Sequence, residues 1–253
     1  GDHRDLHSFP TRRSSDLNAV NSLGEMMIAS RHGNFPVKTG DKIAGTRIIP
    51  LVIEEEKMQK ACEVAGKEPI FRILPYQKKK AGIVTTGSEV YYHRIEDKFT
   101  PVVIEKLKEC GVTEVKQIQC NDDHEMITEA IQTLIEDGSD LIVCTGGMSV
   151  DPDDRTPLAI KNACTEVVTY GAPVLPGAMF MLAYCEKEGR QIPVMGLPGC
   201  VMYAKRTIFD LALPRLLADD EITAEELAAL GEGGLCLNCP VCTYPNCGFG
   251  KGW

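Results

Sequence analysis

The feature that most constrains the fold is a regular alternation of strand-like and helix-like runs between Ala81 and about Asp219. Short apolar runs bounded by turn residues are typical of buried strands, and apolar residues spaced three and four apart are typical of helices. Strands that alternate with helices form right-handed βαβ units, so we expect a three-layer α/β/α domain around a mostly parallel sheet. The expected strands are residues 81–86, 114–120, 140–145 and 192–196, with a β-rich stretch at 167–185, and the expected helices are residues 100–110, 124–137, 157–164 and 201–217.

The composition excludes several classes of protein. The 253 residues are 43% hydrophobic and 25% charged, as in soluble globular proteins. The chain shows neither an apolar run long enough to span a membrane nor a signal peptide, so we expect a cytoplasmic protein. A net charge of −9 argues against nucleic acid or an anionic membrane as a partner. An anionic small molecule stays compatible, because backbone amides and helix N-termini attract phosphate locally.

Further segments flank the alternating region. Residues 1–17 are polar and aperiodic and resemble read-through of a sequencing adapter, so we interpret them as a non-native leader outside the fold. We interpret residues 18–79 as the remnant of a truncated, β-containing N-terminal region, with a hairpin turn at Gly40-Asp41 and a charged helix at residues 54–66. The expected boundaries are therefore 1–17 for the leader, 18–79 for the remnant, 80–221 for the main domain and 222–253 for a Gly/Cys-rich tail.

Polar turns follow four of the expected strands. The most informative is TGGMSVDPDDRTP at residues 145–157, in which two glycines let the backbone approach a ligand closely and three aspartates precede a helix. Ligands of open α/β sheets bind outside the carboxyl ends of the strands, so we expect one composite site for a phosphate-bearing ligand held partly through a divalent cation. Taken alone, this segment also fits a simple turn and helix cap. The other turns are residues 86–89, 121–124 and 196–199.

Four motifs occur in an order that resembles a known family: TTGSEV at 85–90, NDD at 121–123, the segment 145–157, and GLPG at 196–199. They resemble the molybdopterin-binding domain shared by molybdenum cofactor biosynthesis proteins, over residues 80–218. The resemblance implies that molybdopterin or its adenylylated form is the ligand and Mg²⁺ the cofactor. Within the superfamily, the spelling of these motifs is similar to the molybdenumtransferase, which inserts molybdate into adenylylated molybdopterin. The adenylyltransferase is closer at Asp154–Pro157, a loop that a related nucleotide pyrophosphatase domain shares.

The resemblance also implies roles for individual residues. Glu89, Asp122 and Asp154 match the acidic catalytic residues, which would hold the cation or position water. The residues that would offer amides, hydroxyls or close backbone approach to the pterin-linked phosphate are Thr86, Gly87, Ser88, Gly146, Gly147, Ser149, Thr156, Gly196, Pro198 and Gly199.

The chain departs from the molybdenumtransferase pattern at the molybdate site. Leu175–Met179 stands where that family has Lys-Pro-Gly-Lys-Pro, so two lysines that help to hold the anion are missing. Lys205 and Arg206 are the nearest candidate cations. We therefore keep three hypotheses: a molybdenumtransferase-like enzyme, an adenylyltransferase, and a non-catalytic molybdopterin carrier or sensor. A homo-oligomer and a molybdoenzyme client are the expected protein partners.

Eleven cysteines fall into two groups. Seven are scattered singly, and we interpret them as reduced core thiols. The other four lie in the tail at two C-x-x-C steps and one longer step, a spacing that suits tetrahedral Zn²⁺ or a [4Fe–4S] cluster. We expect these cysteines to bind one metal ion or cluster, with zinc favoured over iron–sulfur; free thiols in a disordered tail are the alternative. The core is expected to be complete by about Asp219, and the glycine-rich segment Gly231–Gly234 should let the tail move relative to it. The four residues are Cys236, Cys239, Cys242 and Cys247.

Overall fold

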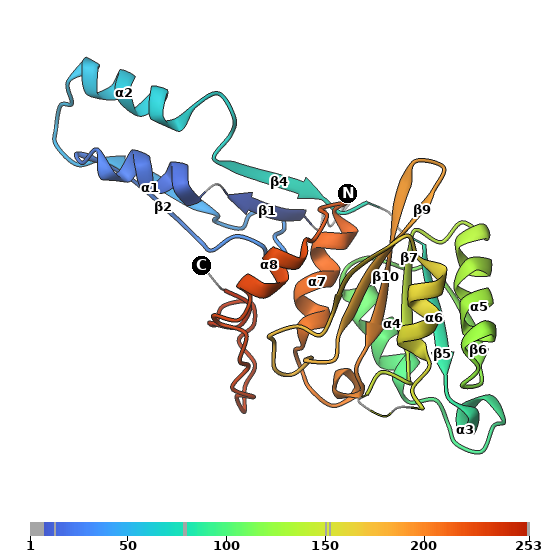
Figure 1. Cartoon of the computed structure of the whole chain (residues 1–253). Coiled ribbons are helices and arrows are strands. Elements are labelled where there is room, and N and C mark those ends of the chain that lie inside the picture. Colours follow the sequence, from blue (N-terminus) through green and yellow to red (C-terminus); the bar gives the residue numbers. More distant parts are fainter. Residues whose placement is uncertain (1–7, 13, 78–79, 150, 152, 252–253) are drawn as a thin grey trace, which may run out of the picture. The chain divides into compact units, whose positions relative to one another are not determined.

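The computed structural model describes residues 8–12, 14–77, 80–149, 151 and 153–251 (Figure 1). The chain divides into two compact units, of which unit 1 ends at Tyr76 and unit 2 begins at Gln77. Within the described ranges, no helix is both long enough and apolar enough to cross a membrane.

Unit 2 is built on a six-stranded mixed sheet with the strand order β6-β5-β7-β10-β9-β8. Four neighbouring strands are parallel, while β9 runs antiparallel to β10 and β8 antiparallel to β9. The mostly parallel sheet predicted from the sequence is therefore confirmed. The strands are β5 (Ala81–Thr86), β6 (Val115–Cys120), β7 (Leu141–Thr145), β8 (Glu166–Tyr170), β9 (Met181–Lys187) and β10 (Arg190–Leu197).

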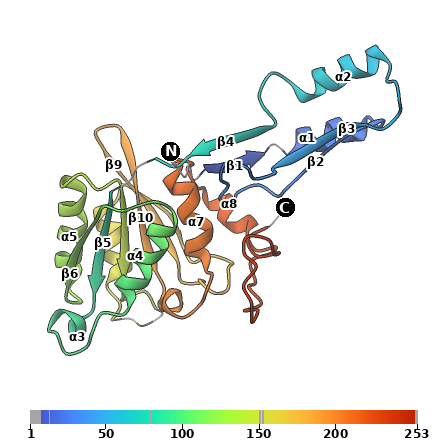
Figure 2. The ribbon, with the colours of Figure 1, turned by 180° about the vertical axis from the view of Figure 1, so that it is seen from behind.

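Helices cover both faces of this sheet, as expected for three layers (Figure 1, Figure 2). On one face lie α5 (His124–Glu136) and α6 (Thr156–Ala163), and on the other lie α4 (Phe99–Glu109) and α7 (Ile208–Leu217). Because β5 and β7 are covered on both sides, every residue of these two strands is buried. The short elements are α3 (Ser88–Tyr91), the 3-10 helix η1 (Gly199–Met202) and α8 (Ala224–Ala229).

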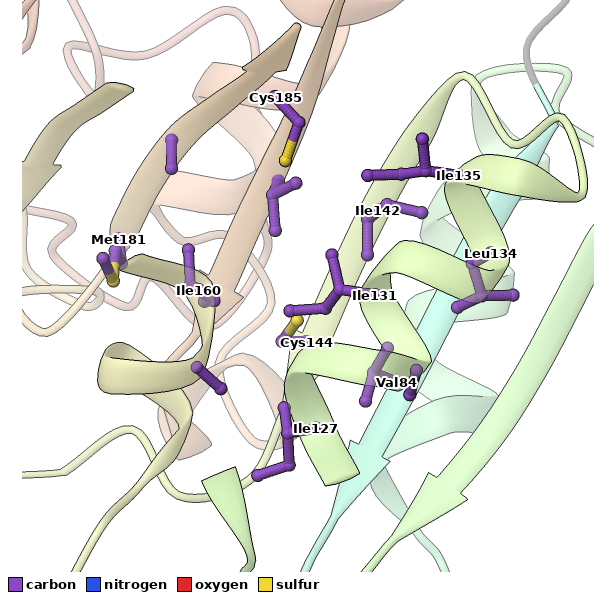
Figure 3. Packing of buried hydrophobic residues seen from close by; sticks show 14 of the residues in the cluster. Val84, Ile127, Ile131, Leu134, Ile135, Ile142, Cys144, Ile160, Met181 and Cys185 are labelled. Atoms are coloured by element: carbon purple, nitrogen blue, oxygen red, sulfur yellow. The ribbon is translucent and has the colours of Figure 1, made fainter. Parts of the chain in front are cut away.

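One hydrophobic core cluster lies between the sheet and the helices α5 and α6 (Figure 3). Ile127, Ile131 and Leu134 recur at helical spacing on α5 and are almost completely buried. They share one cluster with strand residues such as Cys144 of β7 and with Ile160 of α6. This packing fixes α5 and α6, and with them the loops that lead into both helices.

One predicted helix is too long at its start. Residues 201–217 were expected to be helical, but α7 begins only at Ile208. Thr207 caps it: the Thr207 hydroxyl accepts the N–H of Phe209 at 3.2 Å, and the Asp210 carboxylate accepts the N–H of Thr207 at 2.7 Å. The other predicted strands and helices of unit 2 agree with the observed bounds to within two residues.

Among its described residues, 8–12 and 14–76, unit 1 contains two small antiparallel sheets and two helices. Val20, Met26 and Ala61 form its buried cluster. One sheet pairs β1 (Ser8–Arg12) with β4 (Phe71–Pro75), the other pairs β2 (Met26–Ser30) with β3 (Ala44–Ile48), and the helices are α1 (Ser14–Ser22) and α2 (Glu55–Ala65).

The hairpin predicted at Gly40-Asp41 is wrong. The turn itself exists, since Asp41 donates its N–H to the carbonyl of Lys38 at 3.0 Å. However, β3 pairs with β2, fourteen or more residues earlier in the chain, instead of with a strand across this turn. A turn sequence fixes the local reversal of the backbone but does not choose the pairing partner of the strand that follows.

The structure also gives part of the expected leader a place in unit 1. Residues 8–12 pair with β4 through the backbone, and α1 begins at Ser14. Backbone pairing of this kind needs no periodic side-chain pattern, which is why the aperiodic sequence did not indicate it. Residues 1–7, and Lys78 and Lys79 of the basic linker, lie outside the described residues.

Candidate functional site

The four predicted turns lie at one edge of the unit 2 sheet. They follow β5, β6, β7 and β10, which are parallel and adjacent, so their carboxyl ends point in the same direction. Residues from four distant parts of the sequence are thereby brought to a single rim. Such a rim is where open α/β sheets bind ligands.

Two buried hydroxyls connect the loop after β5 to the loop after β7. Thr86 donates its hydroxyl to the carbonyl of Thr145 at 3.1 Å, and Thr156 donates to the carbonyl of Gly146 at 3.0 Å. The two hydroxyl oxygens lie 3.2 Å apart, and the exposed fractions of Thr86 and Thr156 are 5% and 0%. These two threonines hold the loops together through their hydroxyls, and their contact with a ligand stays a prediction.

The glycines of the loop after β7 are required by close packing. Gly146 has a φ of +87°, and a Cβ there would lie 2.4 Å from the carbonyl oxygen of Thr86. At Gly147, with a φ of +56°, a Cβ would lie 2.6 Å from the hydroxyl oxygen of Thr156. Gly146 therefore lets the loop backbone approach that of Thr86, and Gly147 lets it approach the Thr156 hydroxyl.

The remaining predicted glycines divide into two kinds. A Cβ on Gly196 would lie 2.6 Å from the Cε of Met148, so this glycine makes room for a core side chain. Gly87 and Gly199 have no atom within 4 Å of the corresponding Cβ position. These two leave open space at the ends of β5 and β10.

Two of the predicted acidic residues fix loop backbone. Asp122 accepts the N–H of Ser88 at 2.8 Å, which ties the turn after β6 to the loop after β5. Asp154, half-buried, accepts the N–H of Ser149 at 2.6 Å within its own loop. The third, Glu89, is exposed on α3. The three carboxylates thus follow three different strands at the same rim, with Glu89 on α3 and the other two on loops.

The neighbouring carboxylate Asp123 caps α5. It accepts the N–H groups of Glu125 at 2.8 Å and Met126 at 3.1 Å. The hydrogen bonds from the backbone of Met126 and Glu125 lower the pKa of Asp123 below its ordinary value, because they stabilise the charged form. Of the two adjacent aspartates, one is therefore structural to the helix and the other faces the β5 loop.

The expected Mg²⁺ would have to be held without a cluster of three protein ligands. Across residues 8–12, 14–77, 80–149, 151 and 153–251, no three His, Cys, Asp or Glu side chains are grouped to hold a metal ion. Mg²⁺ is commonly held by one or two carboxylates completed by water and substrate phosphates, so the role of Glu89, Asp122 and Asp154 in holding the cation or positioning water stays a prediction. Val150 and Pro152 of the same loop lie outside the described residues.

An open pocket of about 580 Å³ adjoins two of the rim loops. Met148 and Ser149 border it from the loop after β7, and Pro198 and Gly199 from the loop after β10. Three further segments that complete the pocket are residues 175–179, Cys200 and the tail residues 235–236. The sequence motifs had pointed to the first two loops and to residues 175–179, while the tail carried no signal for this position.

Tyr170 is a further rim residue that the sequence analysis missed. Its hydroxyl donates to the carbonyl of Ser149 at 3.3 Å from strand β8. Partial burial and the nearby charge of Asp154 raise the pKa of Tyr170, so it stays a neutral donor at physiological pH. No sequence pattern pointed to it, because the contact joins an edge strand to a loop 21 residues earlier.

The candidate cations do not replace the missing lysines. Lys205 donates to the carbonyl oxygens of Pro240 at 2.9 Å and Cys239 at 3.4 Å in the tail. Arg206 pairs with the carboxylates of Asp210 at 2.8 Å and Glu109 at 3.0 Å. Both side chains are thus engaged away from the rim loops.

The tail is docked on unit 2, which contradicts the expected freely moving tail. Leu175 donates its N–H to the carbonyl of Gly234, and Cys236 donates to the carbonyl of Leu175, both at 2.8 Å. Ile222 and Phe249 are only 2% and 5% exposed. The core therefore extends well past Asp219, because apolar residues of the tail region are buried in it.

The tail cysteines lie around a second pocket, of about 520 Å³. Cys236 and Cys247 are half-buried, and Cys239 and Cys242 are exposed. Cys200 from the loop after β10 lines the same pocket. These thiols are free, and within the described part of the chain they are not gathered around one centre.

Comparison with known proteins identifies a family for the domain. The model of the "Probable molybdopterin binding domain" family matches residues 82–218, which is more than half of the chain. A CinA-like protein of Mycobacterium sp. (strain MCS) is 35% identical over 85 residues, which cover 34% of this chain and 20% of that protein. A CinA-like protein of Mycobacterium avium is 34% identical over 95 residues, which cover 38% of this chain and 22% of that protein. The match thus spans about a fifth of the length of these relatives.

Solved structures are also similar to parts of the chain. The tungsten cofactor synthesizing protein MoaB from Pyrococcus furiosus is 20% identical and aligns over 56% of this chain and 89% of its own, with a TM-score of 0.43. The protein CinA from Thermoplasma acidophilum is 18% identical and aligns over 57% of this chain and 99% of its own, also with a TM-score of 0.43.

Proposed function

The chain belongs to the family of probable molybdopterin binding domains, and we propose that it binds molybdopterin at the carboxyl edge of the unit 2 sheet. The observation that carries this proposal is the meeting of four motif-bearing turns at one rim beside an open pocket. Gly87 and Gly199 leave room for a ligand at that rim. The phosphate of molybdopterin would approach the backbone there, where glycine permits close contact.

The proposed reaction is the molybdenumtransferase-like insertion of molybdate into adenylylated molybdopterin. Cleavage of a phosphoanhydride depends mainly on positioning, and it needs no nucleophilic side chain. Asp154 is the best placed acid, since its bond to Ser149 fixes it beside the residue that borders the pocket. Asp122 and Glu89 would orient water or polar groups of the ligand from the neighbouring loops.

A specific observation supports the non-catalytic alternative. None of the described residues that line the pocket is a lysine or an arginine, so an anion such as molybdate meets no cationic side chain there. A carrier or sensor would bind the pterin without needing a cationic side chain for molybdate. The adenylyltransferase alternative rests on the Asp154–Pro157 sequence.

The variant Asp154→Asn tests the catalytic proposal. It removes the charge but keeps an oxygen that accepts the Ser149 N–H, so molybdopterin binding should persist while AMP release from adenylylated molybdopterin falls at least tenfold. Asp153→Asn is the matched control, because Asp153 is exposed in the same loop. AMP release is measured by chromatography, with and without molybdate.

Four outcomes of this experiment distinguish the hypotheses. Loss of turnover in Asp154→Asn alone supports a catalytic role for Asp154. Equal turnover in both variants removes that role. An unmutated protein that binds molybdopterin but releases no AMP supports the carrier, and one that does not bind molybdopterin overturns the proposed function.

The tail cysteines form a second proposed site, for one thiophilic metal. Cys236, Cys239, Cys242 and Cys247 supply four thiols in a short segment, although their present positions do not converge. One equivalent of zinc, or iron with acid-labile sulfide, in anaerobically purified protein supports the site. If the bound metal is lost in Cys239→Ser but kept in Cys62→Ser, the metal belongs to the tail. Unmutated protein that contains neither zinc nor iron excludes the site.

A further inference from the structure

The pocket beside Ser149 and Gly199 has a wall that no motif of the family resemblance supplies. Leu235 and Cys236 of the C-terminal tail line it together with the rim loops. Both residues also line the thiol-bearing second pocket, so the tail separates the two cavities.

Backbone pairing holds this wall in place. Leu235 forms an isolated parallel bridge with Leu175, made by the two 2.8 Å hydrogen bonds through the backbone of Leu175. Gly234 permits the approach, since a Cβ there would lie 2.4 Å from the carbonyl oxygen of Pro173 and 2.5 Å from that of Leu230. The wall thus depends on a glycine in close contact with two carbonyl groups.

The rest of the tail is anchored to the same domain. Tyr244 donates its hydroxyl to the carbonyl of Asp210 at 3.1 Å, and its ring lies 5.2 Å from the guanidinium of Arg206. Gly250 donates to the carbonyl of Gly233 at 2.9 Å, which closes the tail into a loop beside Gly234. Contacts on both sides of residues 234–236 therefore resist displacement of the wall.

We propose that Leu235 and Cys236 are part of the ligand site and contact the pterin ring of molybdopterin. This inference rests on the proposed function. Leu235 is 62% exposed although it lines a pocket, so a flat apolar face of a ligand gains burial against it. The pocket is mostly apolar and its described lining carries no cation, which suits the ring better than the phosphate. The phosphate then lies toward Gly87, the open glycine of the rim that does not line this pocket.

A pair of leucine variants tests the contact. Leu235→Ala should weaken the binding of molybdopterin, followed by pterin fluorescence, about tenfold. Leu237→Ala is the matched control, because Leu237 is 78% exposed and lines the second pocket but not the pocket beside Ser149. The control should bind as tightly as the unmutated protein.

The outcomes keep the two proposals distinguishable. An unmutated protein that does not bind molybdopterin overturns the proposed function. An unmutated protein that binds, together with a Leu235→Ala variant whose dissociation constant equals that of Leu237→Ala, overturns the present inference while leaving the proposed function standing.

A ligand-free experiment tests the docking of the tail itself. Gly234→Ala should release the wall, so the amides of Leu175 and Cys236 should lose hydrogen-exchange protection, and Cys200 should react faster with iodoacetamide. Gly248→Ala is the control within the tail, because no atom lies within 4 Å of its Cβ position. Equal protection in both folded variants overturns the docked wall. If Gly234→Ala does not fold, hydrogen exchange of the Leu175 and Cys236 amides is measured in the unmutated protein instead. Exchange as fast as in a free peptide would then overturn the docking of the tail.

Discussion

The loop after β7 and the loop after β10 lie at the same rim, but their glycines have different surroundings. Gly146 and Gly147 have positive φ angles and pack against Thr86 and Thr156 with no space for a Cβ. Gly199 has no atom within 4 Å of its Cβ position. Gly146 and Gly147 thus serve the fold, while Gly199 leaves space for a ligand.

This difference separates stability from binding at a single site. The loop after β7 is a platform fixed by buried hydroxyls, and a change there should unfold or distort the rim. Gly199 in the loop after β10 borders the pocket at an open position. A substitution there should weaken ligand binding without changing the stability of the fold. A glycine-rich motif therefore does not by itself say which residues touch a ligand.

The largest expected effect is that of Gly146→Ala. The new Cβ would meet the Thr86 carbonyl oxygen at 2.4 Å, and the φ of +87° adds backbone strain. We expect the free energy of unfolding to fall by about 3 kcal/mol or more, measured by urea denaturation.

Gly199→Ala is the control for that measurement. Its free energy of unfolding should stay within about 0.5 kcal/mol of the unmutated value. If the two alanine variants are equally stable, the distinction between a packed loop and an open loop does not hold.

A smaller loss of stability is expected from Thr156→Ala. The carbonyl of Gly146 and the hydroxyl of Thr86 would both lose a buried partner, which costs about 1–3 kcal/mol. Thr156→Ser keeps the hydroxyl and should recover most of the loss in thermal unfolding. A serine variant as unstable as the alanine variant would show that packing of the methyl group, and not the hydrogen bonds, holds the loop.

Much of unit 2 could be predicted from the sequence because burial on both faces leaves a clear pattern. Strands such as Ala81–Thr86 and Leu141–Thr145 are continuous apolar or small-residue runs, and α5 repeats its apolar residues at helical spacing. Parallel topology then brings the ends of four strands to one rim. The position of the candidate site followed from these regularities.

Other features depend on contacts that no local pattern encodes. The bridge between Leu175 and Leu235 joins residues 60 positions apart through backbone groups, so the docked tail was missed. The roles of Thr86 and Thr156 depend on which way a hydroxyl faces, and a motif does not specify this. The start of α7 did carry a signal, since Thr207 and Asp210 have the spacing of a capping box, but the apolar run from Val201 obscured it.

Binding experiments on Gly199→Ala sharpen the comparison from the side of the ligand. The added methyl group would occupy open space at the end of β10, where the proposed ligand lies. We expect molybdopterin to bind about tenfold more weakly, with no change in the melting temperature. Unchanged binding would place the ligand elsewhere on the rim.

The smallest expected effect concerns the turn after β6, where Asp122 faces the β5 loop and Asp123 caps α5. Hydrogen bonds from Met126 and Glu125 lower the pKa of Asp123 below its ordinary 3.8. A carboxyl whose folded pKa is depressed stabilises the fold above its unfolded pKa and loses that contribution as the pH falls through the folded value. The charged part of the cap should therefore be fully present at pH 7 and fade below about pH 3.8.

The variants Asp123→Ala and Asp123→Ser resolve this contribution in thermal melts between pH 7 and pH 3. At pH 7 the alanine variant should have a lower melting temperature than the unmutated protein. The difference between the two melting temperatures should narrow toward pH 3, because protonation weakens the cap only in the protein that carries the Asp123 carboxylate. The serine variant caps through a hydroxyl that does not titrate in this range, so its gap to the alanine variant should stay constant. A gap between the unmutated and alanine proteins that is independent of pH would mean that Asp123 acts through its shape alone, and the turn after β6 would then resemble the packed loop after β7, where neutral groups hold the backbone.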